Sequence, residues 1–277
     1  MKDRRTLATL SLTVSSLLVA CCAAVRAEEP PNGPGASAPP LTGDCASSEP
    51  PEGFESLFNG ADFAGWKVPE GDNGHWQIVD GVIDYDAQSE APGEKSLWSE
   101  RSFRDFTLLV DWRIKATPYN NPNVPIILPD GTHKRDENGE EIRTVVPDSD
   151  SGVFLRGDGK SQVNIWCWPI GSGEVYGYRM DSSMPADVRA GVTPKLNADR
   201  HIGEWNTFEI TVRGSRLTVV LNGHTVIENA ELPGLPEEGP FALQHHGGMQ
   251  DGEWTGPPSL VQFRNIYVKE LPSGEGH

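Results

Sequence analysis

Apolar and polar residues alternate over short segments along most of the chain after residue 53. In 106–115, apolar residues from Leu108 to Ile114 occupy every second position, and Asp111 lies among polar residues on the other face. Side chains of a β-strand point alternately to its two faces, so this pattern indicates strands with one buried face. It predicts strands at 75–79, 82–85, 96–98, 106–115, 152–156, 162–168, 205–213, 216–221, 224–228, 239–245 and 259–271.

Turn residues separate these segments. Asn222-Gly223 lies between two alternating apolar segments and predicts a tight hairpin, and Asp80-Gly81 and 213–215 carry similar turn residues. No segment of helical length shows a 3.6-residue apolar period outside the first residues of the chain. Many short strands without intervening helices predict an all-β jelly-roll sandwich.

Two long irregular segments interrupt the strands. Residues 117–150 contain five prolines and a charged run, and they include a predicted hairpin of 124–128 against 142–146. Residues 171–203 form the second irregular segment. Loops of this length in compact domains are often functional.

Three of the predicted strands carry unusual side chains on the face that points away from the core. In 162–168 the core face would hold Val163, Ile165 and Cys167. Amides, guanidinium, imidazole and indole rings on one surface are the chemistry of a carbohydrate-binding sheet. The outward residues of the three strands are Gln162, Asn164, Trp166, Trp168, Phe154, Arg156, Gln244 and His246.

The chain is strongly acidic. Its 23 basic and 40 acidic residues give a formal net charge of −17. This charge argues against nucleic acid or an anionic membrane surface as a partner, because both would be repelled. Neutral ligands such as saccharides stay compatible with it.

The first 27 residues predict a signal segment. A basic start is followed by the apolar stretch 7–20, which is too short to span a bilayer stably. Residues 18–21 fit a bacterial lipobox, in which Cys21 would be lipidated, whereas 25–27 fit an ordinary cleavage site. The lipobox is favoured. Both interpretations predict an extracytoplasmic protein. It would be lipid-anchored in the periplasm or at the outer membrane, or else secreted, and a lipid anchor would be its only contact with a membrane.

A linker precedes the folded domain. Residues 28–52 are rich in Pro, Gly and Ala and cannot bury enough apolar surface to fold, so the domain is expected at 53–272, with 273–277 as a tail. An oxidising compartment would permit a disulfide between Cys45 and Cys167. A buried free thiol at Cys167 is favoured, because this residue lies on the predicted core face.

The order of motifs along 53–271 resembles the 3-keto-disaccharide hydrolase domain family. The motifs are GFESLFNGADFAGW, WQIVDGVI, FRDFTLLVDWRI, SGVFLRG, EVYG, GEWNTFEITVRGSRLTVVLNG, GPFALQHHG and VQFRNIYVKEL. The resemblance implies a concanavalin A-like jelly roll and a sugar substrate oxidised at carbon 3. It also implies cleavage of the glycoside after a base removes the proton on carbon 2, which the ketone acidifies.

Such chemistry requires a general base and groups that stabilise an enolate oxygen. The resemblance places His246 as the base, and imidazoles titrate near neutral pH; a structural histidine that holds the loop is the alternative. By strand alternation, His245 should point the other way. Arg156 and Arg264 are candidates for contacts with the enolate oxygen or sugar hydroxyls. An ion pair across the sheet, for example with Asp111, is the alternative and is favoured more for Arg264 than for Arg156.

The remaining candidates would bind the sugar. Gln244 and Asn164 would orient hydroxyl groups, unless they only form an exposed polar strand face. Trp166 and Trp168 would stack on a pyranose ring, unless they pack in the core beneath a long loop. Tyr176 matches the tyrosine of the family and would close the site from the loop.

Two departures from the family pattern leave alternatives open. Relatives often carry a glutamate on the strand after the FLRG motif, where this chain has amides and tryptophans. A non-catalytic carbohydrate-binding lipoprotein is therefore the alternative to an enzyme, and a structural surface protein is a third hypothesis. Asp148 and Asp150 form an acidic cluster that could bind a divalent cation such as calcium, although a solvated acidic loop is favoured in so acidic a chain. No cofactor is otherwise predicted.

Overall fold

The computed structural model describes residues 49–272. The predicted signal segment with Cys21, the linker up to residue 48 with Cys45, and the tail at 273–277 lie outside these residues. The predictions of cleavage, lipidation and a disulfide to Cys45 therefore stay predictions.

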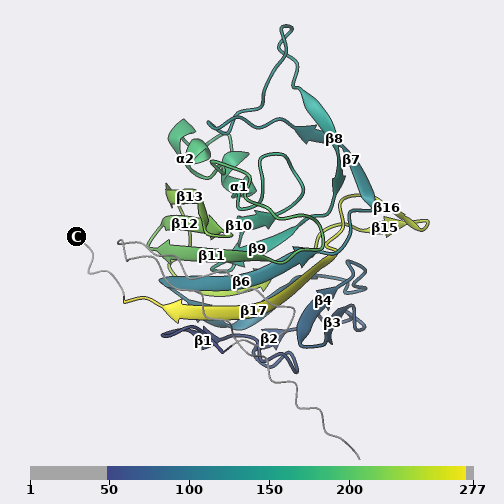
Figure 1. The fold of residues 1–277 in the computed structure, drawn as a ribbon, viewed down its shortest axis with the longest axis vertical. Coiled ribbons are helices and arrows are strands. Elements are labelled where there is room, and N and C mark those ends of the chain that lie inside the picture. Colours follow the sequence, from purple (N-terminus) through teal and green to yellow (C-terminus); the bar gives the residue numbers. More distant parts are fainter. Residues whose placement is uncertain (1–48, 273–277) are drawn as a thin grey trace, which may run out of the picture. The chain divides into compact units, whose positions relative to one another are not determined.

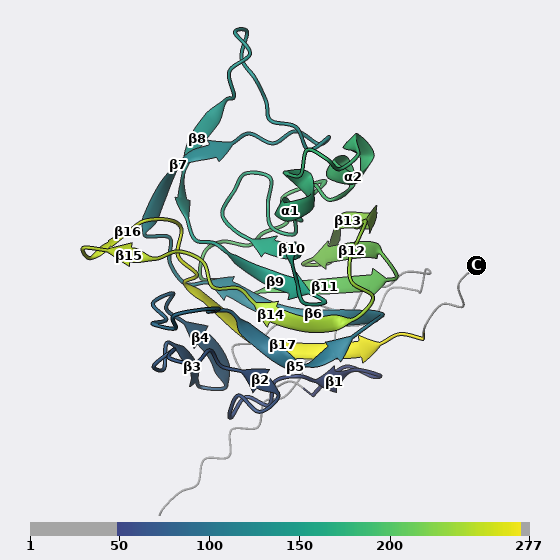
Figure 2. The same cartoon turned by 180° about the vertical axis from the view of Figure 1, so that it is seen from behind.

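Two antiparallel sheets pack face to face (Figures 1 and 2). The larger has the order β13-β12-β11-β6-β17-β4-β3, with β1 also paired to β17, and the smaller has the order β10-β9-β14-β5-β2. The larger sheet comprises β1 Glu55–Ser56, β3 Trp76–Val79, β4 Val82–Tyr85, β6 Phe106–Ile114, β11 Asn206–Arg213, β12 Arg216–Leu221, β13 His224–Glu231 and β17 Val261–Glu270. The smaller comprises β2 Trp66–Lys67, β5 Leu97–Phe103, β9 Ser151–Leu155, β10 Asp158–Ile165 and β14 Gly239–Leu243.

The core lies between the inner faces of the two sheets. Aromatic rings meet there from both sides: the ring of Phe241 on β14 stacks on Phe103 at 4.7 Å and meets Phe106 of β6 edge-on. Val163 and Ile165 of β10 are fully buried, as the alternation in that strand predicts. The prediction of an all-β jelly-roll sandwich is confirmed.

Tight turns connect neighbouring strands where the sequence predicts them. Asn222 and Gly223 have φ angles of 52° and 81° between β12 and β13. Asp80 and Gly81 have φ angles of 51° and 77° between β3 and β4. Positive φ at both central residues is the geometry that matches the twist of a two-residue hairpin.

The two irregular segments hold structure of their own. In the first, β7 (Tyr119–Pro125) pairs with β8 (Arg143–Asp148), which confirms the predicted hairpin and extends it toward the sheets. The second contains the short helices α1 (Tyr176–Arg179) and α2 (Ala186–Gly191), which the periodicity did not predict because they span only one or two turns. A further small hairpin joins β15 (Met249–Gln250) to β16 (Glu253–Trp254).

Arg179 of the second segment links it to the first. Arg179 donates from Nε to Glu174 at 2.6 Å and from a terminal nitrogen to His133 at 2.9 Å. His133 in turn lies 3.1 Å from Glu141 in the hairpin segment. The hairpin is therefore held over the end of the smaller sheet (Figure 1).

Neither helix in the described part of the chain is long and apolar enough to cross a membrane.

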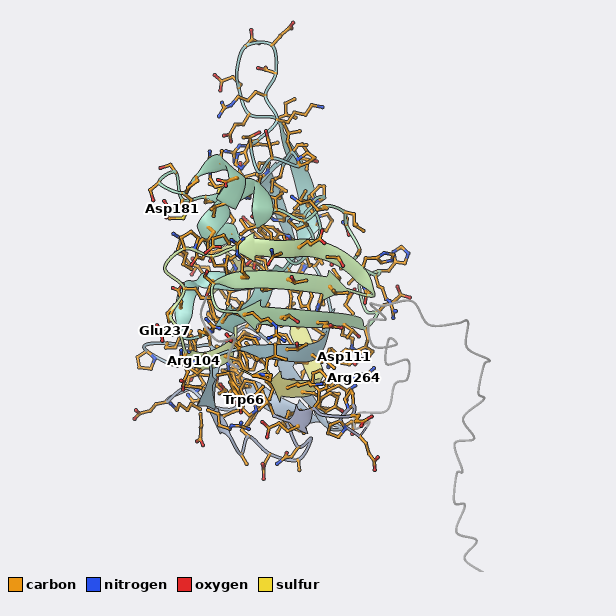
Figure 3. The ribbon with its side chains drawn as sticks, turned by 90° about the vertical axis from the view of Figure 1, so that its left-hand side faces the viewer. Trp66, Arg104, Asp111, Asp181, Glu237 and Arg264 are labelled. Carbon is orange, nitrogen blue, oxygen red and sulfur yellow. The ribbon has the colours of Figure 1, made fainter. Side chains whose placement is uncertain are left out.

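The solvent exposure expected of one residue is wrong. Alternation places Asp111 on the outer face of β6, where it was expected to meet solvent, but it is 1% exposed. It accepts hydrogen bonds from Thr207 and Asn265, and Nε of Arg264 lies 3.4 Å from its carboxylate (Figure 3). The guanidinium of Arg264 also lies 4.0 Å from the ring centroid of Trp205. Side chains of the same sheet thus cover its outer face at this point.

We expect Arg264→Met to lower the free energy of unfolding by about 3 kcal/mol, because removal of one partner leaves a buried charge uncompensated. The matched control is Arg104→Met. Arg104 pairs with Glu237 at 2.9 Å on the surface, with side chains 50% and 81% exposed (Figure 3), and its loss should cost less than about 1 kcal/mol. Urea denaturation of both variants measures the difference. Equal effects would show that the Asp111–Arg264 pair is not a structural element.

Candidate functional site

The outer faces of β9, β10 and β14 carry the polar residues that the alternation predicts. Gln162 is 8% exposed and donates from its amide to the side-chain oxygen of Gln244 and to the carbonyl of Ser151 at 3.1 Å. A Cβ atom at Gly152 would overlap the Gln162 side chain. The glycine of the SGVFLRG motif therefore gives this amide room to cross from β10 to β14.

Asn164 is also on this face. It is 4% exposed, and its main chain pairs with the second irregular segment, through bonds to Glu174 at 2.9 Å and Gly173 at 2.8 Å. No other described residue hydrogen-bonds to its side-chain amide. Together with the nitrogen of Gln244, this amide is available to a ligand.

An aromatic wall follows the end of β10. The rings of Trp166 and Trp168 stack at 4.1 Å with 4° between their planes, and Tyr176 meets both edge-on at 6.1 and 6.4 Å. Trp166 is 3% exposed and donates its indole N–H to the carbonyl of Gly171 at 2.7 Å. Trp168 is less buried, so it is the ring of the pair with the more accessible surface.

Asp148 fixes the orientation of Trp168. Its carboxylate accepts the indole N–H of Trp168 at 3.0 Å, the amide of Asn121 at 2.9 Å and the backbone N–H of Cys167 at 3.2 Å. Burial raises the pKa of Asp148, and these hydrogen bonds oppose the rise.

These contacts bear on the calcium hypothesis. No group of three or more His, Cys, Asp or Glu side chains within residues 49–272 could hold a metal ion. Both carboxylate oxygens of Asp148 accept hydrogen bonds from protein groups. The described residues therefore give no support to a calcium site at Asp148 and Asp150.

Cys167 lies partly buried beside this wall and forms no disulfide within the described residues. Burial raises the pKa of its thiol to about 12. The thiol is therefore protonated and a poor nucleophile at neutral pH.

His246 is held in one tautomer. Its Nδ1 lies 2.7 Å from the carbonyl oxygen of Pro257, which can only accept, so Nδ1 carries the hydrogen. In the neutral ring Nε2 then has the free lone pair and can accept a proton. His245 points elsewhere, as predicted: Nδ1 of this ring lies 2.6 Å from the hydroxyl of Tyr85, and burial lowers its pKa to about 4.

Ser259 joins His246 to Asp150. The backbone N–H of His246 donates to the Ser259 hydroxyl at 2.6 Å, and this hydroxyl donates to the backbone carbonyl of Asp150 at 2.7 Å. Ser259 is fully buried. Gly247, which follows His246, has a φ of 88°, and a Cβ atom at this position would lie 2.8 Å from Pro258. The loop can therefore pack this closely only with glycine.

Asp150 is the most perturbed carboxyl of the site. Burial raises its pKa to about 7; the nearby His246 lowers it and Asp148 raises it further. No described residue donates a hydrogen bond to its carboxyl group. Near neutral pH this group is therefore present in both protonated and ionised forms and can act as an acid or a base.

The amides of the outer face, the aromatic wall, His246 and Asp150 all line one pocket of about 350 Å³, which we call the His246 pocket. Six of the eight predicted catalytic or sugar-binding residues lie in it. Asp150 lies there too, although the sequence suggested only a weak metal ligand or a solvated loop. Its lining residues are Asn121, Asp150, Gln162, Asn164, Trp166, Trp168, Tyr176, Gln244, His246 and Pro257.

Two predicted residues are not brought to the pocket. Arg156 is 2% exposed and donates to the carbonyls of Gly214 at 2.7 Å and Pro236 at 3.0 Å, and to Asp105 at 3.0 Å. Its backbone has a φ of 50° at the turn after β9, so the strand alternation on which its outward placement rested ends before it. Arg264 belongs to the larger sheet and pairs with Asp111. Both arginines stabilise the sandwich. In the pocket, the side-chain amides of Asn164 and Gln244 are the hydrogen-bond donors where the arginines were expected.

Sequence reasoning did not single out Asn121, Pro257 or Ser259. Ser259 and Pro257 lie in a GPPS segment just before β17, which looks like an ordinary turn. Asn121 lies in the inserted hairpin, where its contact with Asp148 depends on the pairing of β7 with β8.

Comparison with known proteins gives one family match. The sequence model of the 3-keto-alpha-glucoside-1,2-lyase-like domain matches residues 53–269. No curated protein sequence matches the chain.

Several solved structures are similar to this chain. A Parabacteroides distasonis protein provisionally named as a glycosyl hydrolase shares 20% identity with a TM-score of 0.47, over 79% of this chain and 84% of that one. The carbohydrate-binding module CBM66 from Bacillus subtilis shares 15% identity with a TM-score of 0.37, over 74% and 96%. The Trypanosoma rangeli sialidase shares 13% identity with a TM-score of 0.38, over 76% and 28%.

We expect Asp150→Asn to stabilise the protein at alkaline pH. The folded state holds the proton of Asp150 up to about pH 7, whereas an ordinary aspartate loses it near 3.8. Wild-type stability from this group therefore falls as pH rises from about 4 to about 7. One pKa unit corresponds to about 1.4 kcal/mol, and the side chain is partly exposed, so the gain above pH 7 should be on the order of 2 kcal/mol.

Thermal unfolding of the wild type and the variant on either side of this pH range measures the effect. The variant's advantage should vanish below about pH 4, where both states are protonated. The exposed residue Asp251 provides the control substitution Asp251→Asn. A stabilisation that does not depend on pH would contradict the raised pKa of Asp150.

Proposed function

Because the chain belongs to the family of 3-keto-alpha-glucoside-1,2-lyase-like domains, we propose that it cleaves the glycosidic bond of 3-keto-glycosides by elimination. The family places it among carbohydrate-active or carbohydrate-binding domains. The observation that carries the enzymatic proposal is the pairing, in one aromatic-walled pocket, of His246 with Nε2 free and Asp150 with a pKa of about 7.

In the first step His246 removes the proton on carbon 2 of the sugar. The ketone at carbon 3 acidifies this C–H bond, and the electron pair moves into the carbonyl to give an enolate. The side-chain amides of Asn164 and Gln244 line the pocket and can donate hydrogen bonds to the enolate oxygen. Donors placed where charge develops stabilise the transition state more than the ground state.

In the second step the enolate expels the group on carbon 1. The ketone re-forms, a double bond forms between carbons 1 and 2, and the bond from carbon 1 to the glycosidic oxygen breaks. Asp150 in its protonated form gives its proton to this oxygen. Water can then add across the double bond, hydroxyl to carbon 1 and proton to carbon 2, which yields net hydrolysis.

The aromatic wall would select the substrate. Trp168 offers an apolar ring surface that suits the C–H face of a pyranose, and Asp148 holds that ring in place. Tyr176 is 40% exposed at the start of α1 and lies at the accessible side of the wall. These residues bind and orient the sugar, and they take no part in proton transfer.

A binding-only function is the second candidate. It is favoured by β10, whose pocket-lining residues Gln162 and Asn164 are amides and not carboxylates, together with the tryptophan pair. In that case the pocket would hold the saccharide without turnover.

We expect His246→Asn to lower the rate of aglycone release from a 3-keto-disaccharide by about 10²–10⁴-fold, the usual contribution of a general base. Substrate binding should change little, because the Trp wall and the amides are kept. The matched control is His245→Asn, which alters the neighbouring ring that faces Tyr85 and should retain the rate. Steady-state kinetics and calorimetric titration separate the two effects. Release that persists in His246→Asn would refute the catalytic role, and tight binding without any turnover by the wild type would favour the binding-only function.

A further inference from the structure

The orientation of one pocket amide is fixed by its neighbours. The side-chain nitrogen of Gln162 lies 3.1 Å from the backbone carbonyl oxygen of Ser151, which can only accept a hydrogen bond. The reverse orientation of this amide would set two oxygens against each other. The same NH₂ group donates its second hydrogen to the side-chain oxygen of Gln244. The oxygen of Gln244 is therefore engaged, and its NH₂ group is the part that remains for a ligand.

The side-chain nitrogen of Gln244 is open to the pocket. Within residues 49–272 it has no hydrogen-bond partner, and it is not among the fully enclosed unpaired atoms. The atom thus keeps accessible surface, and Gln244 lines the His246 pocket. Its backbone is held on both sides, because its N–H donates to the carbonyl of Gly152 at 2.9 Å and its carbonyl accepts the Ser151 hydroxyl at 2.9 Å. Only the side chain needs a further restraint.

Gly152 allows Gln162 to supply that restraint. Strand β9 lies between β10, which carries Gln162, and β14, which ends just before Gln244. A Cβ atom at Gly152 would lie 2.7 Å from Cγ and 2.8 Å from Cδ of Gln162, so the amide crosses β9 where a larger residue would block it. The φ of Gly152 is not positive. Glycine is therefore required here for space and not for backbone conformation.

We infer that Gln162 is a positioning residue, which locks Gln244 as a hydrogen-bond donor in the His246 pocket. The sugar oxygen that meets Gln244 must then be an acceptor. A ketone oxygen only accepts, and its hydrogen bond strengthens as negative charge develops on it in the enolate. A hydroxyl group can accept the same bond but gains no charge. The inference rests on the proposed function for the identity of this oxygen, the ketone at carbon 3.

The first measurement needs no substrate. Side-chain NH₂ signals in ¹H–¹⁵N spectra, assigned by their loss in Gln162→Met and Gln244→Met, report hydrogen exchange with water. Both hydrogens of Gln162 are donated within the protein and should exchange slowly. Those of Gln244 should exchange quickly in the free protein. Exchange at Gln244 that is as slow as at Gln162, or slower, would overturn the inference, because Gln244 would then be donating to the protein.

A double-mutant cycle tests whether Gln162 acts through Gln244. Gln244→Met should lower kcat for a 3-keto-disaccharide by about 10²–10³-fold, because one donor to the enolate oxygen is lost. Gln162→Met should lower kcat by about three- to tenfold with little change in KM, because a free Gln244 side chain must be immobilised in the transition state. In the Gln244→Met background, Gln162→Met should have no further effect. Gln162 lines the pocket itself, so losses that multiply would show direct contact with the sugar and overturn the inference.

Gly152→Ala breaks the same link while both amides are kept. It should displace Gln162, speed the exchange of its NH₂ hydrogens and reproduce the loss of kcat seen in Gln162→Met. The matched control is Gly159→Ala on β10, where a Cβ atom would meet nothing within 4 Å, and both readouts should stay at the wild-type level. Wild-type kcat in Gly152→Ala, with the protection of Gln162 lost, would overturn the positioning role.

These readouts separate the inference from the proposed function. A wild type that binds the 3-keto-disaccharide without releasing aglycone would refute the proposed elimination. Slow exchange at Gln162, with the same non-additive pattern in the Kd from calorimetric titration, would then still uphold the role of Gln162. Additive effects on Kd would overturn it.

Discussion

The register of β9 between β10 and β14 is the constraint on which the site depends. Val153 of β9 pairs with Val163 on one side and Leu243 on the other, and all three are fully or almost fully buried between the sheets. A shift by one residue would turn this apolar row outward and bury the polar row in its place. The cost of exposing the core row therefore fixes Gln162, Asn164 and Gln244 on the outer face.

Chain segments distant in sequence then convert this polar face into a chemical site. Ser259 lies 109 residues after Asp150 and holds its carbonyl next to the backbone of His246. The inserted hairpin supplies Asp148, which orients Trp168. The same enclosure that positions these groups removes water from Asp150 and so raises its pKa toward neutrality. Positioning and acid–base tuning thus have a common cause, the packing of loops over the end of the smaller sheet.

The sequence predicts the sandwich and most of the pocket because both follow from a period of two. Alternation correctly separated Val163 and Ile165 from Gln162 and Asn164, and placed Gln244 and His246 together. It failed where strand geometry ends or the outer face is covered. Arg156 lies at a turn with positive φ, and Asp111 is buried beneath side chains of its own sheet. The role of Asp150 could not be predicted, because its environment is created by Ser259 and His246, whose proximity no local pattern encodes.

In the proposed mechanism, His246 removes the proton on carbon 2 and Asp150 protonates the leaving oxygen. The most direct test is to follow deuterium incorporation at carbon 2 when a 3-keto-glycoside is incubated with the protein in D₂O. Asp150→Asn should still exchange this hydrogen while releasing little aglycone, and His246→Asn should do neither. Exchange at the wild-type rate in His246→Asn would contradict the account, because proton removal would then depend on a different group.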